Sequence, residues 1–202
     1  MSIPLVLFHF LGIIILLFIF WRRLREDYNS DFIFNTAFYG LILLFAGLAI
    51  SQAVAGRFWF WFSFWGYAVG IVIGIIRYEM RIFEVIEASV ISILPWFGLV
   101  FFSDYLLISR AIVSLLAVVV VAILGIVFYL IDKHYKKISW YKSGKIGFSG
   151  MSLLGIMFMV RGVVAYFTDS MLSFSGSNEV LMSATVAFIA FLTLYNLSKS
   201  TK

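Results

Sequence analysis

The sequence predicts an all-α, polytopic membrane protein with seven transmembrane helices. Its 202 residues are 63% hydrophobic and 12% charged, whereas about a quarter of the residues in a soluble domain are charged. The charged residues gather in short segments, and the apolar stretches between them approach the roughly 20 residues that a helix needs to cross a bilayer. The connections are too short to bury a core of their own, so we expect residues 1–202 to form a single transmembrane domain. The expected spans are 3–20, 33–55, 58–76, 83–102, 108–131, 146–167 and 180–197.

The distribution of basic residues predicts that the N-terminus lies outside and the C-terminus in the cytoplasm. Of 15 Lys and Arg residues, all but three follow the first, third, fifth or seventh span. Short connections rich in Lys and Arg stay on the cytoplasmic side of a membrane. An odd number of spans fits this assignment. The residues concerned are Arg22, Arg23, Arg25, Arg77, Arg81, Lys133, Lys136, Lys137, Lys142, Lys145, Lys199 and Lys202.

Several classes of function are excluded by composition. The sequence contains no cysteine, which excludes disulfides, thiolate metal sites and a cysteine nucleophile. No metal site and no cofactor are predicted. The basic residues do not form one continuous face, so a nucleic-acid partner is not predicted either. All function is therefore expected within the membrane or at its surfaces.

The first span contains a histidine, and the second is marked by capping residues and small residues. The first carries His9, about 9 Å from its outer end at 1.5 Å per residue. This imidazole either bonds a carbonyl or head group near the interface or accepts a proton in a cavity. Bulky Trp21 and Arg22 follow this span where a signal peptidase needs small residues, so we expect it to remain in the mature protein. The second span begins beyond the helix-capping residues 29–31 and carries small residues that favour close helix packing.

The third span opens with seven aromatic residues and Ser63 among the eight residues 58–65. Tryptophan rings suit the outer membrane interface, where one edge of the ring meets water. Gly66, Gly70 and Gly74 then recur every four residues and line one helix face. This double GxxxG pattern predicts a helix packed along the glycines, with a lipid chain as the alternative.

The fourth span has polar residues at its inner end and a proline further along. Glu84 and Glu87 share a helix face. They either pair with Arg77 or Arg81, or are hydrated at the interface, or form an acid–base pair or a cation site. Pro95 removes one helix hydrogen bond, which predicts a kink. The fifth span is rich in Val, Leu and Ile and shows no polar site.

The sixth span carries Arg161, well away from any connection. Placing an arginine inside a bilayer costs roughly 2.5 to 3.5 kcal/mol of insertion free energy, so such a residue usually has a charged partner or a functional role. It can reach for the interface, pair with a carboxylate such as Asp104 or Asp169, or bind a phosphate through its planar array of donors. Glycines at 155 and 162 leave room beside it.

The order of these features resembles the prolipoprotein diacylglyceryl transferase family, whose members have seven spans and an outside N-terminus. The similar segments are His9-Phe10-Leu11-Gly12, Trp21-Arg22-Arg23, Phe62-Ser63-Phe64-Trp65-Gly66-Tyr67 with Gly70, Phe83-Glu84-Val85-Ile86-Glu87 leading to Leu94-Pro95, and Gly144-Lys145-Ile146-Gly147-Phe148 followed by Val160-Arg161. Other positions depart from the family pattern. Trp65 occupies the position of the family's catalytic histidine, and Leu11 and Met157 occupy the positions of two tyrosines. Residues 101–103 replace a Gly-Arg-x-Gly motif.

The resemblance implies a bacterial cytoplasmic membrane and a phosphatidylglycerol-type phospholipid held in a cavity open to the outer leaflet. The family transfers the lipid's diacylglyceryl group to the cysteine thiol of a lipoprotein precursor, whose signal segment is then a second partner. Arg161 would bind the phosphate, and His9 is the intramembrane imidazole that would act as base. Substrate contacts are expected from Arg161, Ser63, Trp65, Gly66 and Tyr67, and structural roles for Gly70, Gly74, Glu87 and Pro95.

Two other functions remain open. The chain can be a non-catalytic protein that binds lipid or a partner on the same scaffold. A small transporter or channel is a third possibility, but it would favour inverted repeats and charges at the membrane midplane. The sequence shows no convincing repeat, and its intramembrane charges lie away from the centre.

Overall fold

The computed structural model describes residues 3–135, 147–168 and 176–199, and all regular structure within these ranges is helical. Seven of the described helices are long and apolar enough to cross a membrane, which confirms the predicted fold class. Which ends face the cytoplasm stays a prediction. The elements are α1 (Ile3–Leu24), α2 (Ser30–Val54), the short 3₁₀ helix η1 (Gly56–Phe58), α3 (Trp59–Arg77), α4 (Ile82–Leu107), α5 (Ile112–His134), α6 (Phe148–Phe167) and α7 (Ser177–Lys199).

Local sequence signals explain several helix ends. The α2 helix begins after Asn29, whose side chain accepts a hydrogen bond from the backbone N–H of Asp31, as the capping residues predicted. The α4 helix continues through Pro95 to Leu107, five residues beyond the predicted span. Proline is tolerated there because neighbouring groups in a membrane bundle can satisfy the freed backbone carbonyl. The α7 helix begins at Ser177, three residues earlier than predicted.

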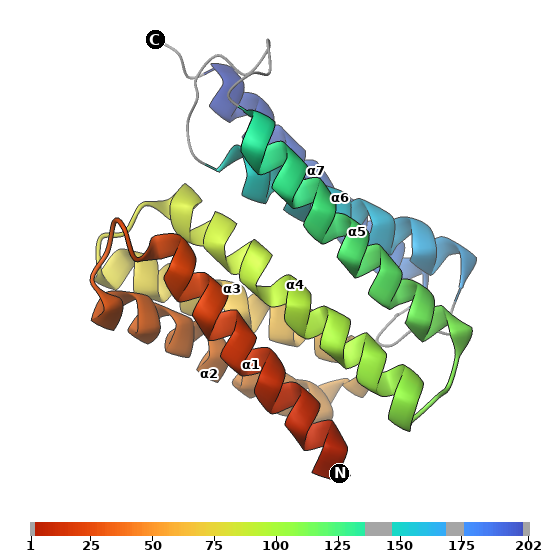
Figure 1. Ribbon diagram of the computed structural model, residues 1–202. Helices are drawn as coiled ribbons and strands as arrows, with labels where there is room; N and C mark the ends of the chain where they lie inside the picture. The colour runs from red at the N-terminus through yellow and green to blue at the C-terminus, as the bar shows by residue number, and fades with distance from the viewer. Residues whose placement is uncertain (1–2, 136–146, 169–175, 200–202) are drawn as a thin grey trace.

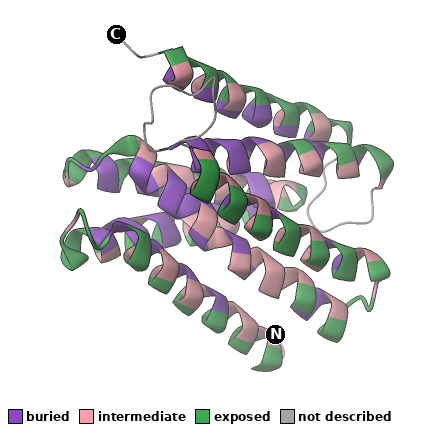
Figure 2. Ribbon diagram, turned by 45° about the horizontal axis from the view of Figure 1, so that its top comes forward, coloured by how far each residue is buried: buried purple, intermediate pink, exposed green. Residues whose placement is uncertain are grey.

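The helices form two groups that meet at α4 (Figure 1): α1, α2 and α3 make up one group, and α5, α6 and α7 make up the other. The α4 helix packs against α1 and α3 on one side and against α5 and α6 on the other. The closest pairs are α2 with α3 and α6 with α7. As a result, α1 lies across α4 from α6 and α7 (Figure 1). Buried residues line the facing sides of the helices, and exposed residues cover much of the outer surface (Figure 2).

The α2–α3 pair is packed through the predicted glycines. A methyl group added at Gly66 would lie 2.1 Å from a backbone oxygen of α2, and one at Gly70 would lie 2.3 Å from another. At Gly74 the added methyl group would lie 2.5 Å from the side chain of Thr36. Real side chains cannot approach this closely, so these glycines set the separation of the two helices. The predicted helix-packing role of the glycine pattern is confirmed.

Aromatic side chains at the start of α3 join the two helix groups. Phe60 and Trp61 pack against Phe158 of α6 and Val186 of α7. Trp61 is only 2% exposed, so its ring packs inside the bundle; the depth of these tryptophans in the membrane stays a prediction. Trp65, four residues later, is 52% exposed. The aromatic segment therefore forms part of the core as well as part of the outer surface.

Candidate functional site

The strongest charged contact near the outer-facing end of the predicted topology joins Arg161 of α6 to Glu179 of α7. Arg161 Nε lies 2.5 Å from Glu179 Oε1, and the two side chains are 13% and 0% exposed. The Arg161 guanidinium also lies 3.6 Å from the centroid of the Phe60 ring, within the range of a cation–π contact. Arg161 is therefore held between a carboxylate and an aromatic face.

Glu179 accepts further hydrogen bonds from two other helical positions. Trp61 Nε1 donates to Glu179 Oε2 at 2.8 Å, and Ser183 Oγ donates to Oε1 at 3.0 Å. A buried carboxylate requires such donors because it has lost its hydration. The centre formed by Arg161, Glu179, Trp61 and Ser183 thus links α3, α6 and α7. We call it the outer ion-pair centre.

The ion-pair partner of Arg161 is neither of the two carboxylates proposed from the sequence. Asp104 lies elsewhere and accepts hydrogen bonds from Ser109 at 2.7 Å and Ser114 at 2.5 Å. Asp169, the other named carboxylate, lies outside the described residues. Reaching for the interface is not the main role of Arg161 either, since its side chain is 13% exposed. The expected salt bridge exists, but with Glu179.

Small residues of α6 make this pairing possible. Gly162 faces Ser183, whose Cβ would lie 3.4 Å from an added methyl group, and Gly155 faces the ring of Phe191. The room beside Arg161 is thus taken by α7, which brings Glu179 into reach. Glu179 stands four residues before Ser183, immediately ahead of an apolar run. That one-turn spacing places Glu179 and Ser183 on one face of α7, but no local pattern in the sequence connects Glu179 with Arg161.

Two apolar grooves flank the outer ion-pair centre. The first, here the α2–α3 groove, has a volume of about 460 Å³. The second, the α6–α7 groove, has a volume of about 430 Å³. Trp61 both lines the α2–α3 groove and donates to Glu179. The lining of the first includes Ala46, Phe62, Trp65, Gly66, Val69 and Met182, and that of the second includes Phe158, Gly162, Val163, Val180 and Phe188.

The predicted substrate residues fall into two sets. Trp65 and Gly66 line the α2–α3 groove. Ser63 and Tyr67 line neither groove; both are buried. Arg161 itself is not part of either lining. Trp61, which shares the Glu179 carboxylate with it, lines the α2–α3 groove, and Gly162, the next residue of α6, lines the α6–α7 groove. The structure therefore brings Trp65, Gly66 and Arg161 to one region and separates Ser63 and Tyr67 from it.

His9 belongs to a different part of the molecule. Trp96 of α4 donates its indole N–H to His9 Nδ1 at 3.3 Å, and the two rings meet edge to face. Arg161 lies across α4 from His9, and no contact joins the two among the described residues. A neutral histidine that accepts at Nδ1 carries its proton on Nε2. The nitrogen that would act as a base is thus already bonded to an indole.

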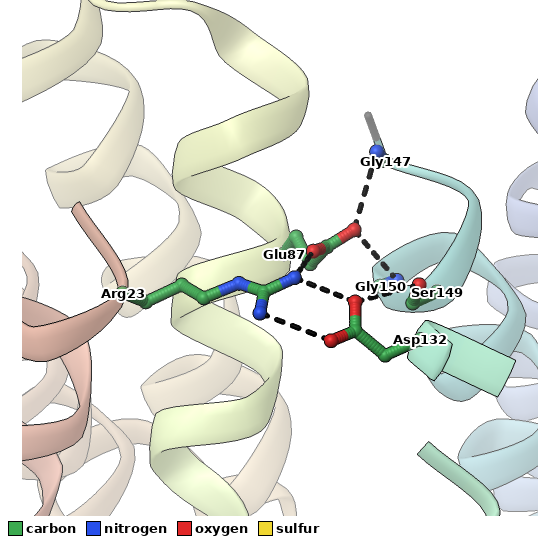
Figure 3. A network of polar contacts seen from close by, with 6 residues as sticks. All are labelled: Arg23, Glu87, Asp132, Gly147, Ser149 and Gly150. Atoms are coloured by element: carbon green, nitrogen blue, oxygen red, sulfur yellow. Dashed lines mark hydrogen bonds and ion pairs between the residues drawn. The ribbon is translucent and has the colours of Figure 1, made fainter. Parts of the chain in front are cut away.

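A second polar network lies at the opposite end of α6 (Figure 3). Arg23 of α1 pairs with Glu87 of α4 and with both carboxylate oxygens of Asp132 of α5, at 2.6 and 3.1 Å. Glu87 also accepts from the backbone N–H groups of Gly147 at 3.2 Å and Gly150 at 3.4 Å. We call this network the inner ion-pair centre. It connects four helices, which agrees with the structural role expected of Glu87.

The two glutamates of α4 enter different networks. Glu84 pairs with Arg81 at 2.8 Å and accepts from the hydroxyl of Tyr28 at 2.7 Å. Burial, together with this bond to Glu84, raises the pKa of the Tyr28 hydroxyl. The predicted pairing with Arg81 is confirmed for Glu84, while Glu87 pairs with Arg23. This division does not favour an acid–base pair made of the two glutamates.

The described residues contain no group of three or more His, Asp or Glu side chains placed to hold a metal ion. The features that they do offer are the outer and inner ion-pair centres and two apolar grooves. Comparison of the sequence and the structure with protein-family models, curated proteins and solved structures found no match.

Proposed function

We propose that this chain is an integral membrane protein that binds a membrane phospholipid in the outer-facing half of its helical bundle. One acyl chain lies in the α2–α3 groove, and the head group lies beside the outer ion-pair centre. Hydrocarbon suits the groove because its lining is almost wholly apolar.

The observation that carries this proposal is the double role of Trp61. Its ring forms part of the groove wall, and its N–H is bonded to the carboxylate that pairs with Arg161. An apolar surface and a charged centre therefore meet at one side chain. A phospholipid has the same two parts in the same order, since its acyl chains join a polar head group.

The contacts favour binding without chemistry. Diacylglyceryl transfer needs a base close to the cation that receives the departing phosphate group. His9 is bonded to Trp96, and Arg161 is paired with Glu179. The two residues occupy helices on opposite sides of α4 (Figure 1). A phosphate would also have to share the Arg161 guanidinium with a carboxylate that is already in place.

Lipid binding can be tested with two matched variants of α3. Val69 lines the α2–α3 groove, whereas Val72, one turn further on, does not; they are 51% and 48% exposed. Native mass spectrometry of protein taken from phosphatidylglycerol bilayers would report the fraction that retains lipid. We expect Val69→Trp to lower this fraction several-fold and Val72→Trp to leave it unchanged. Equal retention in both variants would contradict the proposal.

Transfer activity requires a separate assay. Purified protein in phosphatidylglycerol membranes is incubated with a peptide that carries a lipobox cysteine, and the lipidated peptide is measured by mass spectrometry. We expect lipid retention without transfer. Transfer that is abolished by Arg161→Ala would instead support the enzyme that the family resemblance implies.

A further inference from the structure

Four buried hydroxyl groups gather between α3 and α4, away from both grooves. Ser63 and Tyr67 belong to α3, and Ser89 and Ser92 to α4; their exposed fractions are 8%, 6%, 5% and 0%. Tyr67 lies close to the middle of α3 and Ser92 close to the middle of α4. In a helix that crosses the membrane, these positions correspond to the centre of the bilayer.

Two of these hydroxyls form no hydrogen bond of normal geometry, although Ser89 and Ser92 lie within reach of one of them, Tyr67. Ser63 Oγ and Tyr67 Oη are fully enclosed, and no side chain or backbone group of the described residues forms a hydrogen bond of normal geometry with either. Tyr67 packs in a core cluster with Val85 and Ala88 of α4, and the Ser89 and Ser92 side chains of the same helix lie close to its hydroxyl. Their own protons are used on helix carbonyls, Ser89 donating to Val85 at 2.7 Å and Ser92 donating to Ser89 at 3.0 Å.

Unpartnered hydroxyls are costly at this depth. A buried polar group that has lost water and gained no hydrogen bond destabilises the folded state, and hydrocarbon offers no replacement partner. Most buried polar groups in native structures are satisfied by protein or by ordered water. Two such groups, one helical turn apart on the same face of α3, therefore indicate a ligand that the protein itself does not provide.

We infer that Tyr67, Ser89, Ser92 and Ser63 form a binding site for water at the centre of the membrane. The Tyr67 O–H is a donor, while the Ser89 and Ser92 oxygens retain free lone pairs as acceptors. Water matches this set because it accepts from the tyrosine and donates to both serines. Ser63, four residues before Tyr67, provides a further polar contact along the same face. None of the four side chains is charged, so none would offset the charge of an ion that had lost its hydration in the bilayer.

This site reassigns two residues that the family resemblance linked to substrate. Ser63 and Tyr67 hold water between α3 and α4, whereas the lipid contacts belong to the groove on another face of α3. Hydration is therefore independent of the proposed lipid binding, and either can fail without the other.

Radiolytic hydroxyl-radical footprinting tests the site in the full chain reconstituted in lipid nanodiscs. Radicals formed from a bound water label neighbouring side chains even when bulk solvent cannot reach them. Phe158 is the control because it is 0% exposed and lies in an aromatic cluster. We expect Tyr67 to be labelled several-fold faster than Phe158. Labelling of both residues at the same rate would overturn the inference.

Two variants separate bound water from access by bulk solvent. Tyr67→Phe removes the donor, and Ser92→Ala removes an acceptor without touching the labelled ring. After correction for the lower intrinsic reactivity of phenylalanine, we expect the labelling rate at position 67 to fall in Tyr67→Phe. It should also fall in Ser92→Ala, so that either variant suffices if the other does not fold. A labelling rate that neither variant changes would show that bulk water reaches the ring, and it would also overturn the inference.

Discussion

The outer ion-pair centre predicts a strong energetic coupling between Arg161 and Glu179. Glu179→Gln keeps the size of the side chain and one acceptor oxygen but removes the charge that faces the guanidinium. Removing one partner of a buried pair typically costs about 3 to 5 kcal/mol. Polar groups in the unfolded membrane-bound state also find partners, which moves the expected cost toward the lower limit, about 3 kcal/mol.

The complementary variant, Arg161→Met, keeps the apolar stem that packs on Phe60 and removes the guanidinium. It leaves Glu179 at 0% exposure, with Trp61 and Ser183 still donating to a carboxylate whose cation is gone. We expect a loss of similar size. The double variant should lose far less than the sum, because no uncompensated charge remains; the coupling energy should be about 2 to 3 kcal/mol.

Equilibrium unfolding in mixed micelles of a mild detergent and dodecyl sulfate, followed by circular dichroism, would measure these free energies. Arg57→Met is the control, since Arg57 is exposed and its loss should change stability by less than about 0.5 kcal/mol. The reasoning fails if the two single changes each cost less than about 1 kcal/mol and their effects add. That result would mean that the pair contributes no more than a surface contact.

Three further predictions follow from other parts of the structure. Gly70→Ala should destabilise the protein by about 1 to 3 kcal/mol, whereas Gly125→Ala, whose added methyl group meets nothing within 4 Å, should lower the melting temperature little; equal effects would contradict glycine-mediated packing. Because the pKa of Tyr28 is raised in the folded state, its contribution to stability is complete below the ordinary value of about 10 and is lost as pH rises above it. Tyr28→Phe should lose less stability there, and an equal loss would contradict the shift. In the cysteine-free chain, a membrane-impermeant maleimide should label Arg57→Cys in intact cells and Glu26→Cys only after permeabilisation; the reverse would invert the topology.

Sequence reasoning succeeded where the decisive contacts are local or periodic. The seven spans follow from apolar length, and the glycine spacing in α3 correctly predicted a close helix neighbour. Glu84 pairs with Arg81, three residues away, because two residues so placed meet on any α-helix. Each of these predictions requires only helix geometry and the thickness of a membrane.

Long-range pairs escaped prediction for a physical reason. The predicted seventh span began at residue 180 and left Glu179 in the connection before it. In the structure Glu179 lies in the first turn of α7 and pairs with Arg161 of α6. Arg23 was interpreted as a cytoplasmic topology signal, yet it also pairs with Asp132, 109 residues away. Such a pair depends on which helices become neighbours, and apolar periodicity does not determine that.

The two ion-pair centres have a common consequence for how the bundle is held together. Helices in a bilayer gain little from burying apolar surface against each other, since lipid tails are equally apolar. The outer centre ties α3 to α6 and α7, and the inner centre ties α1 and α4 to α5 and α6 (Figure 3). Between them lies an apolar contact formed by residues such as Leu94, Phe128 and Leu153. Since the centres engage opposite ends of α6, polar contacts between the two helix groups are made at both ends of that helix. Arg161 therefore helps to position the wall of the α2–α3 groove, through Glu179 and Trp61.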